Sequence, residues 1–359
     1  FLQTTGRVGM GLLAAGVAAG PPAQAQAQNQ GESTGSQLHA SSAPPAKDGD
    51  IPSEPIPLRE FGKTGVKVSA LGLGGFHIGI PKDEALAIRI IQEAIDNGIT
   101  FMDNCWDYHM GVSEERMGKA LRGRRDQVFL MTKVCTHGRD AKVGMKQLED
   151  SLRRLRTDYI DLWQIHEVAY HNDPKLHFAP GGVAEALLKA REQGKVRFLG
   201  FTGHKHPDLH LEMLSHDFPF DAVQMPLNPF DGTFLSFEQN VLPELRRRGI
   251  APIGMKPLGG TGDMVRQGAV TVEEALRYAM SLPVAVTVTG MESLEVLRQN
   301  LRIARGFRPM SPEEMEALRQ RVAPLAADGR FELFKTSALF EGDVGRKQHG
   351  FPLAKDMDL

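Results

Sequence analysis

The sequence of 359 residues contains only two cysteines and two tryptophans, and its net charge is only -2. Two cysteines cannot form a disulfide-rich scaffold or supply the four thiolates of an iron–sulfur cluster. The near-neutral balance of 42 basic and 44 acidic residues leaves no electrostatic footprint for nucleic acid. Because 41% of the residues are hydrophobic, we expect a folded chain. The length permits two domains or one barrel of roughly 250 residues.

The first 50 residues differ in composition from the rest. Residues 1–19 are rich in glycine and alanine, and they are too short and too weakly apolar for a spanning helix of about 20 residues. Small residues then alternate with glutamine at 23–27, as at a secretory cleavage site. The opening Phe-Leu-Gln resembles the end of the twin-arginine motif, without its arginines. We therefore expect an export signal at 1–27, a disordered spacer at 28–55 and a periplasmic protein without a membrane span; a disordered tail is the alternative.

From residue 56 onward, strand-like and helix-like segments alternate. Parallel strands need long crossover connections, so this alternation predicts an α/β fold with a parallel sheet. Eight such units predict a (β/α)8 TIM barrel over 56–308, with an N-terminal hairpin and a C-terminal helix and tail over 309–359. Strands are expected at 68–75, 100–103, 128–134, 160–166, 197–202, 222–226, 251–256 and 284–289. Helices are expected at 83–97, 113–121, 143–155, 182–193, 209–215, 241–248, 272–281, 294–305 and 312–322.

A doubly wound open sheet is the competing architecture. Such a sheet usually carries Gly-x-Gly-x-x-Gly between its first strand and first helix. Here residues 72–75 read Gly-Leu-Gly-Gly, and no helix start follows at the right distance. The closed barrel is therefore preferred.

Polar residues end several of the predicted strands. Asp103 ends the second strand and is followed by Tyr108, while Lys133 and His166 end the third and fourth. Catalytic groups of a TIM barrel lie at these strand ends. Each residue alone could be structural: a capping carboxylate, a lysine that reaches the surface or a buried histidine. Their coincidence on three neighbouring strands favours a catalytic group.

These four residues form a chemically coherent set. A phenol has a pKa of about 10, and a lysine beside it is expected to lower that value. Asp103 would supply the counter-charge that a buried Lys133 needs. His166 would orient a carbonyl oxygen by hydrogen bonding. The set is suited to protonating an aldehyde or ketone oxygen while a hydride arrives at carbon.

The sequence resembles the aldo-keto reductase family over about 56–304. Residues 58–75 are similar to the family's N-terminal hairpin and first strand, and 101–121 to its second-strand signature. The stretches LMTKV and IDLWQIH match the lysine and histidine strands. The resemblance implies a catalytic tetrad of Asp103, Tyr108, Lys133 and His166, with Tyr108 as the general acid or base.

The resemblance also implies a nicotinamide cofactor at the ends of strands five to eight. His204 stands where the family has asparagine, and Arg298 is out of register with the family's 2′-phosphate group. NADP(H) is the family default and is preferred to NAD(H). The expected cofactor-binding residues are Thr202, Gly203, Gln224, Met255, Pro257, Leu258, Gly260, Gly290, Met291, Gln299 and Asn300.

Phe76, Trp106 and His109 flank the predicted mouth. We expect them to line a pocket for a small carbonyl or sugar-like substrate, although Trp106 could simply pack under a loop. The tail at 332–352 could form a lid or only cap the barrel. A non-catalytic, cofactor-binding barrel that serves as a redox sensor or partner module is the alternative function.

Two further groups of residues allow a second interpretation. His204, His206 and His210 could be metal ligands of a barrel hydrolase, but a solvated loop is favoured and no metal site is predicted. Cys105 and Cys135 each follow a strand end. They are interpreted as structural thiols, with a disulfide as the alternative. The sequence leaves the oligomeric state open.

Overall fold

The computed structural model describes residues 51–135, 140–338, 340–353 and 356. The expected export signal and residues 28–50 of the expected spacer lie outside the described residues. Residues 51–55, at the end of that spacer, are described. Arg305 donates hydrogen bonds of 3.0 Å to the carbonyl oxygens of Ser53 and Glu54. Residues 51–55 therefore lie against the barrel.

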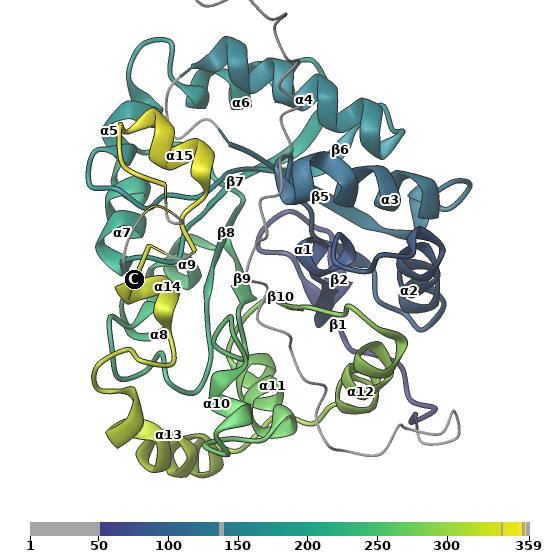
Figure 1. Ribbon diagram of the computed structural model, residues 1–359, viewed down its shortest axis with the longest axis vertical. Helices are drawn as coiled ribbons and strands as arrows, with labels where there is room; N and C mark the ends of the chain where they lie inside the picture. The colour runs from purple at the N-terminus through teal and green to yellow at the C-terminus, as the bar shows by residue number, and fades with distance from the viewer. Residues whose placement is uncertain (1–50, 136–139, 339, 354–355, 357–359) are drawn as a thin grey trace, which may run out of the picture. The chain divides into compact units, whose positions relative to one another are not determined.

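Eight parallel strands close into a barrel in the order β10-β3-β4-β5-β6-β7-β8-β9 (Figure 1). This closure confirms the predicted (β/α)8 fold and excludes the open sheet. The strands are β3 (Leu71–Leu73), β4 (Phe101–Met102), β5 (Phe129–Val134), β6 (Ile160–Ile165), β7 (Val196–Thr202), β8 (Ala222–Pro226), β9 (Ala251–Met255) and β10 (Val286–Thr289).

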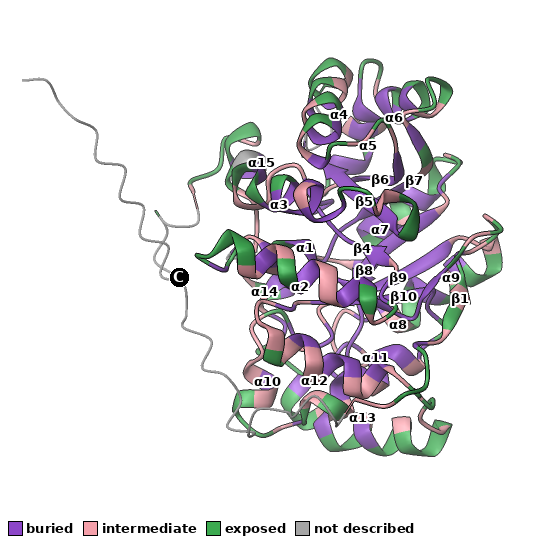
Figure 2. Cartoon of the chain, turned by 90° about the vertical axis from the view of Figure 1, so that its right-hand side faces the viewer, coloured by how far each residue is buried: buried purple, intermediate pink, exposed green. Residues whose placement is uncertain are grey.

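Helices connect successive strands and surround the barrel (Figure 1). Buried residues lie on the strands and on the helix faces turned toward them, while the outer helix faces are exposed (Figure 2). The longer helices are α2 (Glu84–Asp96), α3 (Val112–Ala120), α4 (Ala141–Leu155), α6 (Val183–Glu192), α7 (Pro207–Ser215), α9 (Leu242–Arg248), α11 (Val272–Ser281), α12 (Leu294–Ala304) and α13 (Pro312–Ala326).

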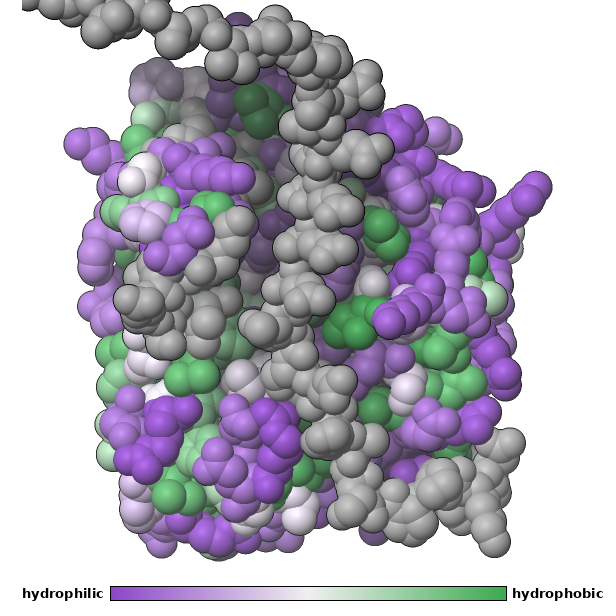
Figure 3. Space-filling view, viewed as in Figure 1, coloured by the Kyte–Doolittle hydropathy of each residue, from purple (hydrophilic) through white to green (hydrophobic). Residues whose placement is uncertain are grey.

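Short helical turns lie between these elements. The sequence did not predict them, because segments of three to six residues are too short to show helical periodicity. They are α1 (Gly75–Ile78), η2 (Tyr108–Gly111), η3 (Arg125–Gln127), α5 (Asp173–Phe178), α8 (Phe237–Asn240), α10 (Asp263–Arg266), α14 (Leu333–Thr336) and α15 (Asp343–Gln348). Among the described helices, none has both the length and the apolar character needed to cross a membrane. On the face seen in Figure 3, the described surface is mostly hydrophilic, with hydrophobic side chains in separate small groups.

The first two barrel strands are shorter than predicted, and a close backbone approach explains why. A Cβ atom on Gly75 would lie 2.3 Å from the carbonyl oxygen of Asp103 and 2.8 Å from the Cα atom of Asn104. Only glycine permits this contact. The chain therefore leaves β3 early, enters α1 and packs directly on the segment that carries Asp103.

An N-terminal hairpin fills one end of the barrel. Its strands are β1 (Leu58–Glu60) and β2 (Lys67–Ser69), which pair in antiparallel fashion. Phe61, in the turn between them, is fully buried, and its ring lies 4.7 Å from that of Phe129 and 6.1 Å from that of Phe101. This aromatic plug closes the barrel at the amino ends of the strands, so a site can form only at the carboxyl ends.

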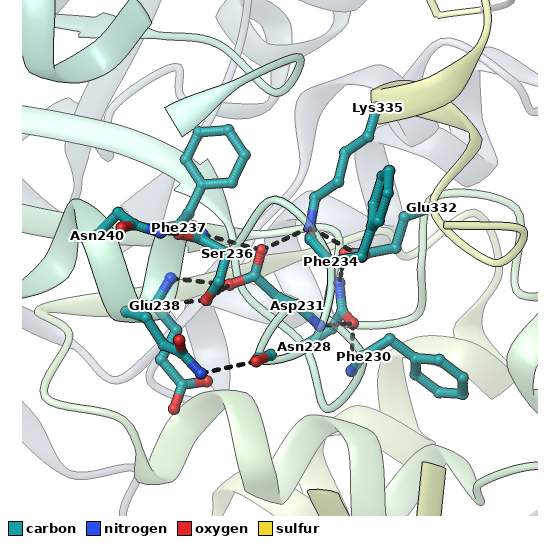
Figure 4. A network of polar contacts seen from close by, with 12 residues as sticks. Asn228, Phe230, Asp231, Phe234, Ser236, Phe237, Glu238, Asn240, Glu332 and Lys335 are labelled. Atoms are coloured by element: carbon teal, nitrogen blue, oxygen red, sulfur yellow. Dashed lines mark hydrogen bonds and ion pairs between the residues drawn. The ribbon is translucent and has the colours of Figure 1, made fainter. Parts of the chain in front are cut away.

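The C-terminal tail is fixed to the barrel by a buried polar network (Figure 4). Lys335 Nζ on α14 donates to Asp231 Oδ1 at 2.7 Å and to Glu332 Oε2 at 2.8 Å. Asn228 Nδ2 donates to Glu332 Oε1 at 2.8 Å. Beyond the network, α15 is flanked by two further contacts: Lys205 Nζ, after β7, donates to Glu341 Oε1 at 2.7 Å, and His349 Nε2 lies 3.1 Å from Asp173 Oδ1 on α5. The tail therefore covers the carboxyl ends of β6, β7 and β8 and is held there by charge.

We expect Lys335→Met to destabilise the protein strongly. The variant leaves Asp231 and Glu332 buried without their counter-charge, which typically costs about 3–5 kcal/mol. The free energy of unfolding in urea measures the effect. The control is Lys347→Met on the exposed side of α15, which should change stability by less than about 0.5 kcal/mol. Equal stability of the two variants would contradict the anchoring role of Lys335.

Candidate active site

Lys133 is the centre of the polar group at the carboxyl ends of the strands. Its Nζ donates to Asp103 Oδ1 at 2.6 Å, to the carbonyl oxygen of Asn104 at 2.8 Å and to Tyr108 OH at 3.1 Å. The lysine and aspartate side chains are only 1% and 5% exposed. All three ammonium protons are therefore used. Because the phenol oxygen accepts one of them, the phenol's own proton is left for another acceptor.

Two glutamines extend this group across the barrel. Gln224 Nε2 on β8 donates to Asp103 Oδ2 at 2.8 Å, and Gln164 Nε2 on β6 donates to Gln224 Oε1 at 3.0 Å. These bonds hold both oxygens of the Asp103 carboxylate in place. Gln224 was predicted to bind the cofactor, and one of its two amide N–H groups is engaged by Asp103 here.

The expectation that Lys133 lowers the pKa of Tyr108 is wrong. The pKa of this phenol is raised well above its ordinary value, first by burial and then by the negative charge of Asp103. The physical reason is that burial and the charge of Asp103 outweigh the Lys133 ammonium, which lies closer to Asp103 than to the phenol. Tyr108 is therefore neutral at physiological pH.

His166 lies beside Tyr108, and the two ring centroids are 6.0 Å apart in an edge-on arrangement. Its Nδ1 is 3.4 Å from Cys105 Sγ and 3.3 Å from Cys135 Sγ. Both cysteines are buried and free, so the alternative of a disulfide is not the state observed. Burial raises the pKa of the Cys105 thiol to about 12 and that of Cys135 well above its usual range.

The three residues expected to line the substrate pocket lie at or near the mouth. Phe76 is 49% exposed and packs edge-on to Tyr108, with centroids 5.5 Å apart. His109 Nε2 lies 2.9 Å from the Phe76 carbonyl oxygen. Trp106 is half-buried, and its ring lies 5.4 Å from the Arg154 guanidinium. Phe76 and His109 thus form an aromatic wall beside the phenol, whereas Trp106 packs against α4.

The expected cofactor residues occupy the ends of the last four barrel strands. Thr202 ends β7 and pairs in register with Gln224. Gly203 comes next in the chain. A Cβ atom at this position would lie 2.4 Å from the Val168 carbonyl oxygen, so position 203 requires glycine. Met255 ends β9, and Pro257 and Leu258 follow in a turn that leads to Gly260, whose φ is +78°.

The segment after β10 carries four of the expected cofactor residues: Gly290, Met291, Gln299 and Asn300. A Cβ atom on Gly290 would lie 2.4 Å from the His77 ring, so the backbone passes close to α1. Asn300 Nδ2 donates to the Gly290 carbonyl oxygen at 3.3 Å, and Gln299 lies half-buried beside Asn300 on α12. The Met291 side chain is in the hydrophobic core, which leaves only its backbone for a ligand. Phosphate sites of TIM barrels commonly form after the seventh and eighth strands, here β9 and β10.

Arg298 is engaged elsewhere: its Nε donates to Glu93 Oε1 on α2 at 2.8 Å. Arg298 therefore contacts α2. In the sequence, Arg298 was out of register with the family's group for the 2′-phosphate.

The pair of His204 and Glu167 was not predicted. His204 Nε2 lies 2.6 Å from Glu167 Oε1, and both side chains are buried. Burial, aided by Lys256, keeps the pKa of His204 well below its usual value, so the ring is neutral and its Nε2–H faces the carboxylate. Nδ1 is then an acceptor, and it has no hydrogen-bond partner among the described residues. The substitution of asparagine by His204 was the only sequence signal for this arrangement.

The three histidines of the His204–His210 segment are not gathered into a metal site. His204 pairs with Glu167, His206 Nδ1 accepts from the backbone N–H of Asp208, and His210 is buried 3.5 Å from the Gln224 carbonyl oxygen. Each therefore has a separate local contact, which disfavours the metal-dependent hydrolase.

The fold and this site define a class of protein: a (β/α)8 barrel with a tyrosine, a lysine and an aspartate hydrogen-bonded at the strand ends. The chain belongs to the aldo/keto reductase family, whose family model matches residues 70–267. The structure is similar to that of the aldo-keto reductase AKR11C1 from Bacillus halodurans, with a TM-score of 0.63. That match is 24% identical and covers 74% of this chain and 96% of the other.

Two relatives illustrate the similarity in sequence. The aldo-keto reductase YhdN of Bacillus subtilis is 34% identical over 195 residues, which are 50% of this chain and 55% of that protein. The L-galactose dehydrogenase of Arabidopsis thaliana is 31% identical over 231 residues, which are 59% of this chain and 68% of that protein. The chain therefore spans about half of the first relative's length and two thirds of the second's.

We expect Lys133→Met to lower the free energy of unfolding by about 3–5 kcal/mol, because Asp103 would remain buried without its counter-charge. Adding Asp103→Leu should recover most of this loss, since an apolar pair replaces an ion pair at little net cost. Urea unfolding of the two single variants and the double variant measures the coupling. Additive losses would show that the two charges do not stabilise one another.

Proposed function

We propose that this protein is a nicotinamide-dependent oxidoreductase that interconverts a carbonyl group and an alcohol, with Tyr108 as the general acid or base. The observation that carries the proposal is the contact of 3.1 Å between Lys133 Nζ and Tyr108 OH. It fixes the phenol oxygen and leaves the phenol proton available to a substrate oxygen.

The protein's own residues would act on the proton and on the developing charge. In the reductive direction Tyr108 gives its proton to the carbonyl oxygen, and the Lys133 ammonium stabilises the phenolate left behind. Asp103, held by Gln224, keeps that ammonium in position. His166 would donate a hydrogen bond that orients the same carbonyl oxygen.

The residues at the strand ends fit a nicotinamide nucleotide, which supplies or accepts the hydride when bound. His204 offers a buried acceptor at Nδ1, suited to the N–H of a carboxamide. Gly260, with its left-handed backbone, and Gly290, packed on His77, leave room for backbone approach to phosphates. NADP(H) is proposed over NAD(H) as the usual cofactor of the family that the sequence resembles.

The substrate is proposed to be a small aldehyde, ketone or sugar-like alcohol. Phe76 and His109 present an aromatic wall beside the phenol, which suits a small organic molecule. The relative that acts on L-galactose supports a sugar-like compound.

Export is proposed from residues 1–27. Free nucleotide is scarce outside the cytoplasm, so the cofactor would be loaded before export and released slowly. Mass spectrometry of the nucleotide that co-purifies from the periplasm tests its identity and its retention.

We expect Tyr108→Phe to lower turnover of aldehyde substrates by about 10²–10⁴-fold, the usual contribution of a general acid. The variant removes only the hydroxyl, so nucleotide binding should be retained. Tyr159→Phe, at the opposite end of β6, is the matched control and should keep full turnover. If Tyr108→Phe stays as active as this control, the proposed function fails.

Nucleotide affinity should fall as pH rises above about 8. Burial lowers the pKa of Lys256 to about 8, so the lysine is cationic below that pH and neutral above it. This cation follows β9 at the mouth of the barrel and would attract an anionic nucleotide bound there, an attraction that is present below pH 8 and lost as the pH rises. Dissociation constants measured from pH 7 to 9 test this, with Lys256→Gln as the variant and the exposed Lys189→Gln as its control. A pH dependence that persists in Lys256→Gln would assign the effect to another group.

A further inference from the structure

Four potential metal ligands from three neighbouring strand ends meet beside the proposed catalytic histidine. Cys105 follows β4, Cys135 follows β5, His166 follows β6, and Asp107 lies two residues beyond Cys105. Their ligand atoms all lie within 4.8 Å of one another. In the part of the chain that the structure describes, no second group of this kind occurs.

The distances within this group suit a tetrahedral cation. The two sulfur atoms are 3.3 Å apart, and His166 Nδ1 lies 3.4 Å from Cys105 Sγ and 3.3 Å from Cys135 Sγ. Zinc bonds of about 2.3 Å to sulfur and about 2.0–2.1 Å to nitrogen place such atoms roughly 3.5–3.8 Å apart. Accommodating a cation therefore needs these three atoms to move apart by only a few tenths of an ångström, while the Asp107 carboxylate, which lies within 4.8 Å of them, has to move closer.

The fourth donor is the carboxylate of Asp107, whose Oδ1 atom is buried. This carboxylate interacts with the thiols of both Cys105 and Cys135, so it faces the other ligands of the group. A cation that displaces the two thiol protons would take their place beside this oxygen. Two cysteines and one imidazole favour a soft or borderline cation over Mg²⁺ or Ca²⁺.

We propose that Cys105, Cys135, His166 and Asp107 form a binding site for one thiophilic divalent cation such as Zn²⁺. Both thiols are deprotonated on coordination, so two protons are released for each cation bound and no oxidation is involved. The site shares His166 with the tetrad, and its other three ligands are not members of the tetrad.

The cation would fix the proton on His166. Coordination occupies Nδ1, so the ring keeps its single proton on Nε2 and presents a hydrogen-bond donor on its other side. This link to the carbonyl-orienting role of His166 rests on the proposed function. Binding of the cation does not depend on the proposed function. The experiment below measures this binding alone, so its failure is distinguishable from failure of the proposed function.

The test is a titration of the reduced, metal-free full-length protein with Co²⁺. We expect one equivalent to produce thiolate-to-cobalt charge-transfer absorption with the visible bands of a tetrahedral site, and Zn²⁺ to abolish both by displacement. Two protons should appear in a weakly buffered solution for each Co²⁺ bound.

Variants assign the ligands. Cys105→Ser and Cys135→Ser should each remove the charge-transfer band or weaken binding by more than the roughly 10–100-fold typical of an outer-shell partner. Asp107→Asn should weaken binding and keep the band, whereas the exposed His171→Ala should change neither. A reduced protein that gives no charge-transfer band overturns the proposal. A band that keeps its full intensity at one equivalent in both serine variants overturns it as well.

Discussion

The buried ion pair of Lys133 and Asp103 is the constraint on which the mouth of the barrel depends. An ammonium that is only 1% exposed is stable there because a carboxylate lies 2.6 Å away. The carboxylate is positioned by Gln224 from the far side of the barrel and by the close approach of Gly75 to its backbone. Removing either charge would leave the other unpaired in the interior. The ion pair therefore fixes the relative position of the carboxyl ends of β4 and β5.

The same principle operates at the tail, where Lys335 is buried between Asp231 and Glu332. Aromatic residues accompany both lysines: Lys133 lies 4.7 Å from the Tyr108 ring centroid and Lys335 lies 5.7 Å from that of Phe237. Apolar packing closes the opposite end of the barrel, where Phe61 fills the interior. The barrel is therefore closed by hydrophobic contact at the amino ends of its strands and organised by paired charges at the carboxyl ends.

The sequence was sufficient to predict the barrel and the gathering of Asp103, Tyr108 and Lys133, because parallel strands bring their carboxyl ends to one face. It was insufficient for the raised pKa of Tyr108, since that value depends first on how deeply the phenol is buried and then on its distance from Asp103. The group formed by Cys105, Cys135 and His166 was also missed: its members are about 30 residues apart along the chain, and no short motif connects them. His204 marked a departure from the family pattern, but its partner Glu167 is visible only in three dimensions.

The tail network has a consequence for the order in which this chain can mature. Lys335 neutralises Asp231, a residue 104 positions earlier, so the loop after β8 keeps a buried carboxylate without its partner until α14 has been synthesised and has docked. All eight barrel strands precede Lys335 in the chain. The strands can therefore pair before the mouth of the barrel is completed.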